Sequence, residues 1–163
     1  MAKTEKTHAM RVLDATGVAY RATVYDASGA FHSGEDAAAL VGAPAEAVYK
    51  TLVVLREATP RARPLLAMVP SNAQLDLKLL AASIGEKKLR MATQREAEQL
   101  TGMQVGGISA LGLRRPTFEI LLDEAARSLD RIHVSAGARG VDIELRVDDL
   151  VSATNARFVR ATG

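Results

Sequence analysis

The chain has 163 residues, of which 48% are hydrophobic and 25% are charged, with a net charge of +2, and this length predicts one domain over residues 1–163. The absence of cysteine excludes a disulfide scaffold, a thiolate nucleophile and a cysteine-based metal site. The charge is too small to indicate nucleic-acid binding by itself, and without a signal-peptide core or a long apolar run we expect a cytoplasmic protein.

The elements predicted for the first part of the chain alternate between helical and strand patterns. In chain order they are a helix over 4–15, a strand over 18–24, a helix over 33–42 and strands over 50–56 and 65–69. Apolar and polar residues alternate from Val18 to Val24, which predicts a half-buried strand. Ser33 is the expected N-cap of the second helix. The last two strands are expected to pair, because an arginine- and proline-rich hairpin loop joins them.

The elements predicted for the rest of the chain are shorter. In chain order they are a strand end running into a helix over 75–84, a strand over 87–91, a helix over 93–102, a glycine-rich loop over 103–113, strands over 117–123, 132–135 and 141–145, and a helix over 147–154. Glu96 lies three residues after Thr93, the spacing of a capping box. The short connections favour antiparallel strands, so one α/β or α+β domain is expected.

The usual catalytic signatures are absent from the sequence. The segment 107–112 is one residue too long for a serine nucleophile elbow. His8, His32 and His133 lack the short spacing that places two imidazoles on one metal, and no nucleotide phosphate loop occurs. The segment 137–140 matches the G-x-x-G loop that clamps a nucleic-acid backbone in KH domains, although two glycines three apart more often form a hairpin turn.

Lys50 is the most informative residue, because it stands at the start of an apolar strand. A lysine in this place is either a solubility residue at a strand edge or a cation aimed into a cleft. Two distant segments favour the cleft. One is 105–109, whose double glycine lets the backbone approach a ligand closely, and the other is 135–145.

Several sequence blocks carry a family resemblance because they occur together and in one order. They are Tyr49-Lys50-Thr51-Leu52, Gln74-Leu75-Asp76-Leu77-Lys78, Thr101-Gly102 with Val105-Gly106-Gly107-Ile108-Ser109, and residues 135–145. With these blocks the chain resembles the YbaK/EbsC family of aminoacyl-tRNA deacylases from about Ala9 to its end, most closely the Cys-tRNA(Pro) deacylases. The resemblance implies a mixed α+β fold with a barrel-like, largely antiparallel mixed sheet surrounded by helices, shared with the editing domain of prolyl-tRNA synthetases.

The resemblance also implies an activity. A synthetase pocket for proline cannot strongly reject a residue of similar volume, because small apolar differences are worth only ~1–3 kcal/mol. Family members remove the misattached cysteine from Cys-tRNA(Pro), and also from Cys-tRNA(Cys), by letting the substrate thiol attack its own ester. Neither a metal nor a cofactor is expected. The implied partners are mischarged tRNA and, in a transient complex, prolyl-tRNA synthetase.

The family match assigns Lys50 as the essential lysine, which holds the aminoacyl ester or the terminal ribose. The other implied pocket residues are Tyr25, His32, Ser33, Thr51, Gly106, Gly107, Ile108, Ser135, Gly137 and Asp142. Backbone amides near Gly106 and Gly107 would suit a developing oxyanion. Each residue also has a structural interpretation: Ser135 could cap a turn, and Asp142 could pair with Arg139 or face solvent.

One position departs from the family pattern. Ser33 stands where the family has an aromatic residue before a helix, and Phe31 and His32 are the candidates to take the place of that aromatic side chain. Three alternatives therefore remain open. The chain could hydrolyse another aminoacyl ester, such as Ala-tRNA(Pro), with water as the nucleophile. It could instead bind tRNA or a synthetase without catalysis, or it could bind a small molecule.

Overall fold

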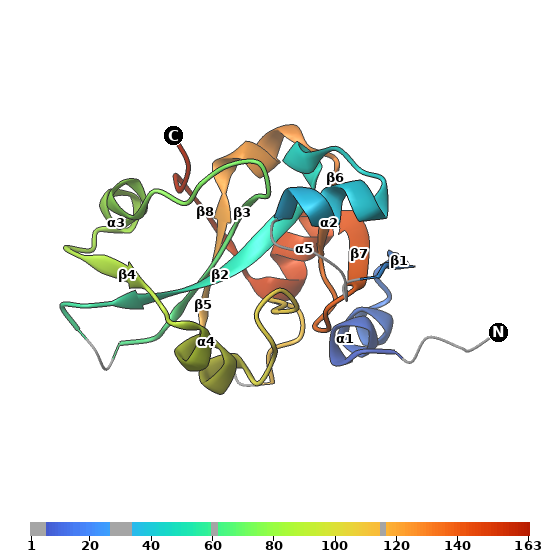
Figure 1. The fold of residues 1–163 in the computed structure, drawn as a ribbon, viewed down its shortest axis with the longest axis horizontal. Coiled ribbons are helices and arrows are strands. Elements are labelled where there is room, and N and C mark those ends of the chain that lie inside the picture. The colour runs from blue at the N-terminus through green and yellow to red at the C-terminus, as the bar shows by residue number, and fades with distance from the viewer. Residues whose placement is uncertain (1–5, 27–33, 60–61, 115–116) are drawn as a thin grey trace.

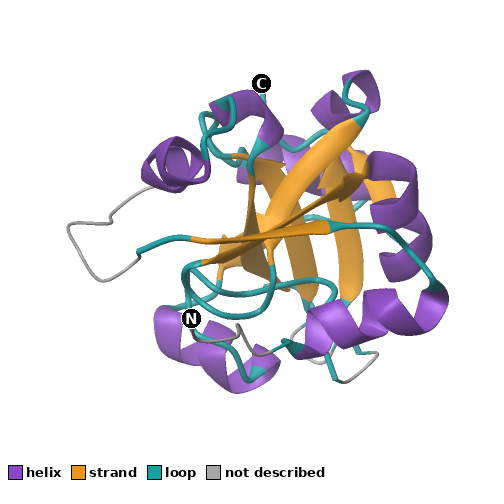
Figure 2. Cartoon of the chain, turned by 90° about the vertical axis from the view of Figure 1, so that its right-hand side faces the viewer, coloured by secondary structure: helices purple, strands orange, loops and turns teal. Residues whose placement is uncertain are grey.

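The computed structural model describes residues 6–26, 34–59, 62–114 and 117–163. The helices are α1 (His8–Thr16), α2 (Gly34–Val41), α3 (Leu77–Ile84), α4 (Gln94–Thr101) and α5 (Val147–Thr154), with 3₁₀ turns η1 (Ala45–Ala47) and η2 (Glu124–Ser128). The strands are β1 (Arg21–Val24), β2 (Tyr49–Arg56), β3 (Leu65–Pro70), β4 (Leu89–Met91), β5 (Glu119–Asp123), β6 (Arg131–Ser135), β7 (Val141–Arg146) and β8 (Arg157–Val159). The helices surround the strands (Figures 1 and 2).

The strands form two sheets, with the orders β4-β2-β3-β5-β8 and β1-β7-β6. The second sheet is antiparallel, and the first is mixed because β5 runs parallel to both β3 and β8. The parallel pair β3–β5 needs a long crossover, which α3, β4 and α4 occupy. A parallel bridge between Val48 and His133 joins the start of β2 to β6. The expected mixed α+β class is confirmed, and the expected barrel-like sheet consists of two sheets that meet at this bridge.

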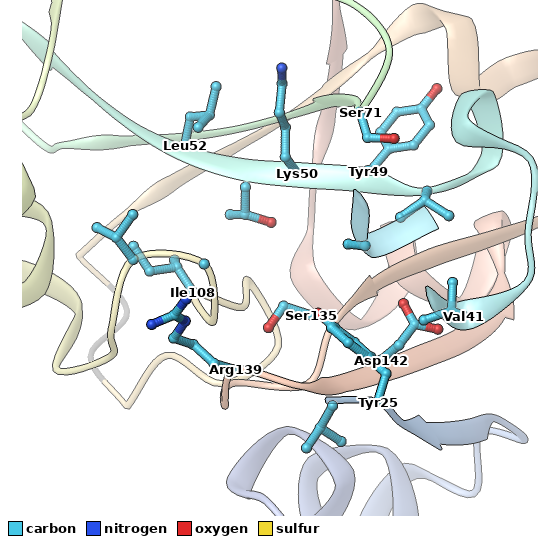
Figure 3. A pocket seen from close by; sticks show the side chains of 16 residues that line it. Tyr25, Val41, Tyr49, Lys50, Leu52, Ser71, Ile108, Ser135, Arg139 and Asp142 are labelled. Carbon is cyan, nitrogen blue, oxygen red and sulfur yellow. The ribbon is translucent and has the colours of Figure 1, made fainter. Parts of the chain in front are cut away.

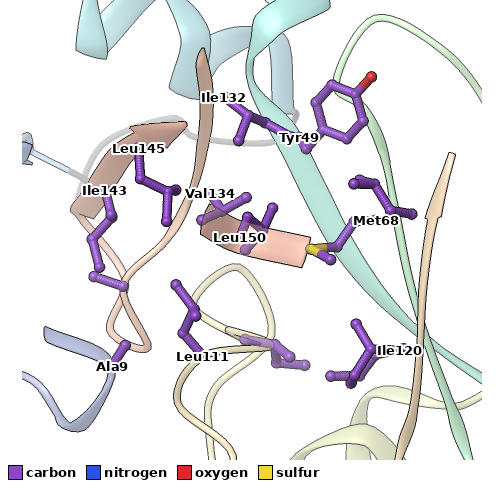
Figure 4. Packing of buried hydrophobic residues seen from close by; sticks show 14 of the residues in the cluster. Ala9, Tyr49, Met68, Leu111, Ile120, Ile132, Val134, Ile143, Leu145 and Leu150 are labelled. Carbon is purple, nitrogen blue, oxygen red and sulfur yellow. The ribbon is translucent and has the colours of Figure 1, made fainter. Parts of the chain in front are cut away.

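The hydrophobic core consists of two clusters separated by the mixed sheet. The larger one draws residues from both sheets, including Tyr49, Met68, Ile132 and Ile143 (Figure 4). The smaller one lies on the other face of the mixed sheet, where α3 packs. Every residue of β3 is buried, which explains its unbroken apolar sequence. The two clusters together fix the position of β2, the strand that carries Lys50.

Two elements near the N-terminus differ from the sequence prediction. α1 begins at His8 rather than at residue 4, because the Thr7 hydroxyl accepts a hydrogen bond from the Met10 backbone N–H and caps the helix. β1 spans only Arg21–Val24, and the alternation fails because Ala22 and Val24 are exposed. β1 pairs with β7 alone, so it is an edge strand whose side chains need no burial on both sides. The predicted N-cap Ser33 lies outside the described residues.

The later predictions agree more closely with the structure. The strand expected before the helix at 75–84 is wrong, because the Asp76 side chain instead caps α3 by accepting from the Leu79 N–H. β4 starts only at Leu89, two residues later than expected. The pairing of β2 with β3 and the helix at 147–154 are confirmed. The segment 137–140 forms the turn of the β6–β7 hairpin, the more common of its two interpretations.

The capping box at the start of α4 is confirmed and leads to a stability prediction. The Thr93 hydroxyl accepts from the Glu96 N–H at 3.2 Å, and the Glu96 carboxylate accepts from the Thr93 N–H at 2.9 Å. Thr93→Ala should lower the free energy of unfolding by about 1 kcal/mol, because one helix N–H loses its acceptor. Urea unfolding measures the change, with Thr117→Ala at an exposed loop position as the control. Equal stability of the two variants would contradict the prediction.

Candidate functional site

A pocket of about 360 Å³ opens beside the first half of β2. Its lining residues are Tyr25, Ala37, Val41, Val48, Tyr49, Lys50, Thr51, Leu52, Ser71, Val105, Gly106, Ile108, Ser135, Arg139, Val141 and Asp142. It thus brings together seven of the predicted site residues: Tyr25, Lys50, Thr51, Gly106, Ile108, Ser135 and Asp142. Gly107 and Gly137 do not line it. His32 and Ser33 lie outside the described residues.

The pocket exists because one edge of β2 is open over a short stretch. β2 pairs with β3 from Tyr49 to Val54, whereas its pairing with β4 begins only at Val54. On the same side as β4, the bridge to β6 ends at Val48. Between these points the loop at 103–113 and the β6–β7 hairpin face β2 across the pocket. A ligand can therefore reach Lys50, Thr51 and Leu52 without competing with a strand.

Lys50 supplies a cation at the pocket. It is half-buried, lies opposite Val69 of β3 and forms no ion pair with any described residue. In Figure 3 the side chains of Lys50 and Leu52 rise from one side of β2, whereas Ser135 and Asp142 lie on the other side. Lys50 and Asp142 therefore line the pocket from opposite sides of β2.

Two hydroxyl groups on β2 have no hydrogen-bond partner within the described part of the chain. They are the buried oxygens of Thr51 and Tyr49. Burial, with a smaller contribution from Asp123, raises the pKa of the Tyr49 phenol, so this group stays protonated. A buried hydroxyl without a partner costs free energy. Because Thr51 also lines the pocket, its hydroxyl can hydrogen-bond a ligand there.

The glycines of the two loops have different environments. Gly106 lines the pocket with φ +92°, and a Cβ there would lie 3.4 Å from Nε of Arg139. A Cβ on Gly107 would lie 2.7 Å from the Arg139 backbone nitrogen, which is closer than real Cβ contacts. The Gly107 N–H donates to the Gln104 carbonyl at 2.8 Å. Gly137, with φ +98°, faces the same loop. Gly107 and Gly137 thus allow the loop and the hairpin to pack together.

Ser135 and Asp142 face each other across the β6–β7 hairpin. The Ser135 hydroxyl accepts from the Gly137 N–H at 3.2 Å, so it caps the turn as well as lining the pocket. Asp142 is only 4% exposed and does not face solvent. Its Oδ2 lies 2.7 Å from Nδ1 of His133.

His133 is a residue that the sequence reasoning missed, because the three histidines are scattered along the chain. The register of the hairpin was the available signal, since it places position 133 opposite Glu144 and diagonally across from Asp142. The hydrogen bond with Asp142 raises the pKa of His133. Burial raises the pKa of Asp142, and the bond to His133 opposes that rise.

The hydroxyl groups around the pocket are not arranged as nucleophiles. The Ser71 hydroxyl donates to the Ala45 carbonyl, and the Ser109 hydroxyl accepts from the Leu111 N–H. His133, the one imidazole beside the pocket in the described chain, contacts the carboxylates of Asp142 and Glu144. The described residues also contain no cluster of three histidine, aspartate or glutamate side chains suited to a metal. None of the described helices is long and apolar enough to cross a membrane.

Comparisons with known proteins agree on one family. The family described as the aminoacyl-tRNA editing domain matches residues 29–153. A protein of Enterococcus faecalis, named as a candidate Cys-tRNA(Pro)/Cys-tRNA(Cys) deacylase EbsC, is 36% identical over 97% of this chain and 94% of its own length.

Solved structures also match. A candidate trans-editing enzyme for prolyl-tRNA synthetase has a TM-score of 0.80 at 25% identity, covering 98% of this chain and 99% of its own. A hypothetical protein has a TM-score of 0.82 at 24% identity, covering 96% of this chain and 99% of its own, and supports the fold alone.

Proposed function

This chain belongs to the aminoacyl-tRNA editing domain family and is an aminoacyl-tRNA deacylase, and we propose that it removes cysteine misattached to tRNA(Pro), and also cysteine on tRNA(Cys). The relative named for these two substrates supports this choice. The proposed chemistry is ester cleavage assisted by the thiol of the substrate.

The observation that carries the proposal is the lack of an activated protein nucleophile at the described part of the pocket. Its serine hydroxyls bond to backbone groups, and His133 bonds to Asp142. In the proposed reaction the thiolate of the cysteinyl group attacks its own ester carbonyl. A C–S bond forms, the C–O bond to the terminal ribose breaks, and the ribose oxygen takes up a proton. The products are a cyclic thiolactone and the released tRNA.

The remaining task of the protein is to hold the ester in a reactive conformation. Orientation of two groups within one molecule can contribute ~7–11 kcal/mol in the best cases. In this proposal Lys50, which lines the pocket, holds the terminal ribose or the ester. The apolar side chains of Ile108 and Leu52 line the pocket and limit the access of water to the ester.

We also propose that prolyl-tRNA synthetase supplies the tRNA specificity. The net charge of the chain is only +2, which provides little electrostatic attraction for a phosphate backbone. The related candidate trans-editing enzyme is described as acting for that synthetase. The isolated chain should therefore bind different tRNAs with similar affinity. Strong discrimination among tRNAs in a binding titration would contradict this part of the proposal.

The test compares release of amino acid from Cys-, Ser- and Ala-tRNA(Pro). Serine differs from cysteine by one atom, and its hydroxyl is far less ionised than a thiol at neutral pH. We therefore expect cysteine to be released at least about 100-fold faster than serine or alanine. Comparable release of serine or alanine would assign the attack to water, and no release from any ester would leave a binding protein.

A further inference from the structure

A buried pair of ionisable side chains lies beside the pocket and has no role in the chemistry above. His133 of β6 and Asp142 of β7 are joined by the 2.7 Å contact between Nδ1 and Oδ2, and their side chains are 14% and 6% exposed. The other ring nitrogen, Nε2, lies 3.4 Å from Oε2 of Glu144. Both nitrogens of the imidazole therefore face carboxylates.

An ionised carboxylate only accepts hydrogen bonds. With Asp142 ionised, Nδ1 of His133 therefore carries the proton of the contact between them. The charged groups that act on His133 are Asp142 and Glu144 of β7 and Arg131 of its own strand. Of the elements packed against β6, η1 carries Glu46 and β2 carries Lys50. Asp142 and Glu144 contact the ring directly, and this environment favours a donor at both nitrogens.

Asp142 is the one acidic side chain among the described residues that line the pocket. It uses one carboxylate oxygen for His133, and a carboxylate has a second oxygen able to accept. An aminoacyl ester differs from most esters by its α-amino group, which is cationic at or below a pH of about 7.7. A buried carboxylate beside the ester is the natural partner of that cation.

We propose that His133 is a positioning residue that fixes the Asp142 carboxylate, so that this carboxylate binds the α-ammonium group of the aminoacyl ester. The proposal rests on the proposed deacylase function and adds the feature by which the pocket recognises an ester with a free amino group. An isolated carboxylate buried here would be poorly solvated, and it would take up a proton or turn away. The hydrogen bond to His133 opposes both changes.

The test compares Cys-tRNA(Pro) with mercaptopropionyl-tRNA(Pro), whose acyl group is cysteine without its α-amino group. The wild-type kcat/KM should favour the cysteinyl ester by about tenfold or more, the effect of one hydrogen bond to a charged group. His133→Phe removes the donor and should abolish most of this preference, chiefly through a higher KM for the cysteinyl ester. His133→Asn offers an amide N–H near the position of Nδ1 and should retain the preference. Asp142→Asn should lose it.

A second readout does not depend on activity. NMR titration of the His133 ring should give a pKa above the ordinary 6.5, because the bond to Asp142 stabilises the charged form until the pH exceeds the raised value. Asp142→Asn should lower this pKa. A wild-type pKa at or below 6.5 would overturn the proposal even if His133→Phe fails to fold.

The outcomes separate the two proposals. If the wild type cleaves Cys-tRNA(Pro) without preferring it over the desamino ester, or if folded His133→Phe keeps the full preference, the role of His133 is wrong and the deacylase function stands. If neither ester is cleaved while the His133 pKa is raised, the deacylase function fails, and with it the role for the pair.

Discussion

Replacing Lys50 with alanine is expected to lower kcat/KM for deacylation of Cys-tRNA(Pro) by about 100-fold or more, the usual cost of removing one electrostatic contact from a reacting ester. The Lys50 ammonium group is half-buried at the open edge of β2 and has no ion-pair partner in the described chain. A ligand that binds it therefore does not compete with a carboxylate of the protein. Single-turnover deacylation measures the loss.

Protein stability should change little in this variant, because no described ion pair of the folded protein is broken. Lys88→Ala is the matched control, since that lysine lies far from the pocket lining and its side chain is 74% exposed. The control should retain full activity. If Lys50→Ala keeps more than about one tenth of the wild-type rate, the lysine does not contact the reacting ester.

Replacing Gly107 with alanine should lower both stability and activity. The added Cβ would lie 2.7 Å from the backbone nitrogen of Arg139 and 2.9 Å from the carbonyl carbon of Ala138. Because backbone atoms cannot rotate away, the loop and the hairpin must separate. We expect a loss of about 1–3 kcal/mol, the usual cost of overpacking, and a fall in melting temperature of roughly 3–10 °C.

The activity of Gly107→Ala should fall even at temperatures where it is fully folded, because the displaced loop carries Gly106 and Ile108 into the pocket lining. Gly85→Ala is the control. Gly85 has φ +75° but open space around its Cβ position, so only backbone strain is introduced, and it lies far from the pocket. A melting temperature for Gly107→Ala above that of Gly85→Ala would contradict the predicted clash.

Most of the fold could be predicted because local signals and burial agreed. The apolar sequence of β3 and the capping box of α4 each specified an element that the tertiary structure preserves. The prediction for β1 was wrong about which side chains are buried, because Ala22 and Val24 are exposed. Alternation of apolar and polar residues indicates burial only where a second layer covers one face of the strand. The strand expected before α3 failed because Asp76, a helix-capping residue, ends the extended segment.

The candidate site was predicted in part for similar reasons. Lys50 and Asp142 stood in blocks shared with a known family, and both line one pocket. His133 was missed because its partner lies nine positions away across a hairpin, and only the strand register brings the two together. Gly107 was assigned to the ligand, whereas it lies against the neighbouring hairpin. A sequence indicates that a glycine is needed, and the structure shows which contact needs it.

The residues that line the pocket come from segments that are far apart in the sequence, so the ribosome synthesises them at different times. Tyr25 comes from the end of β1, Lys50 from β2 and Asp142 from β7, and the two sheets that supply them meet at the Val48–His133 bridge. A nascent chain on the ribosome cannot form this pocket until residue 142 has left the exit tunnel. Partly synthesised or proteolytically shortened chains lacking β7 should therefore be unable to discharge the aminoacyl-tRNAs that surround the translating ribosome.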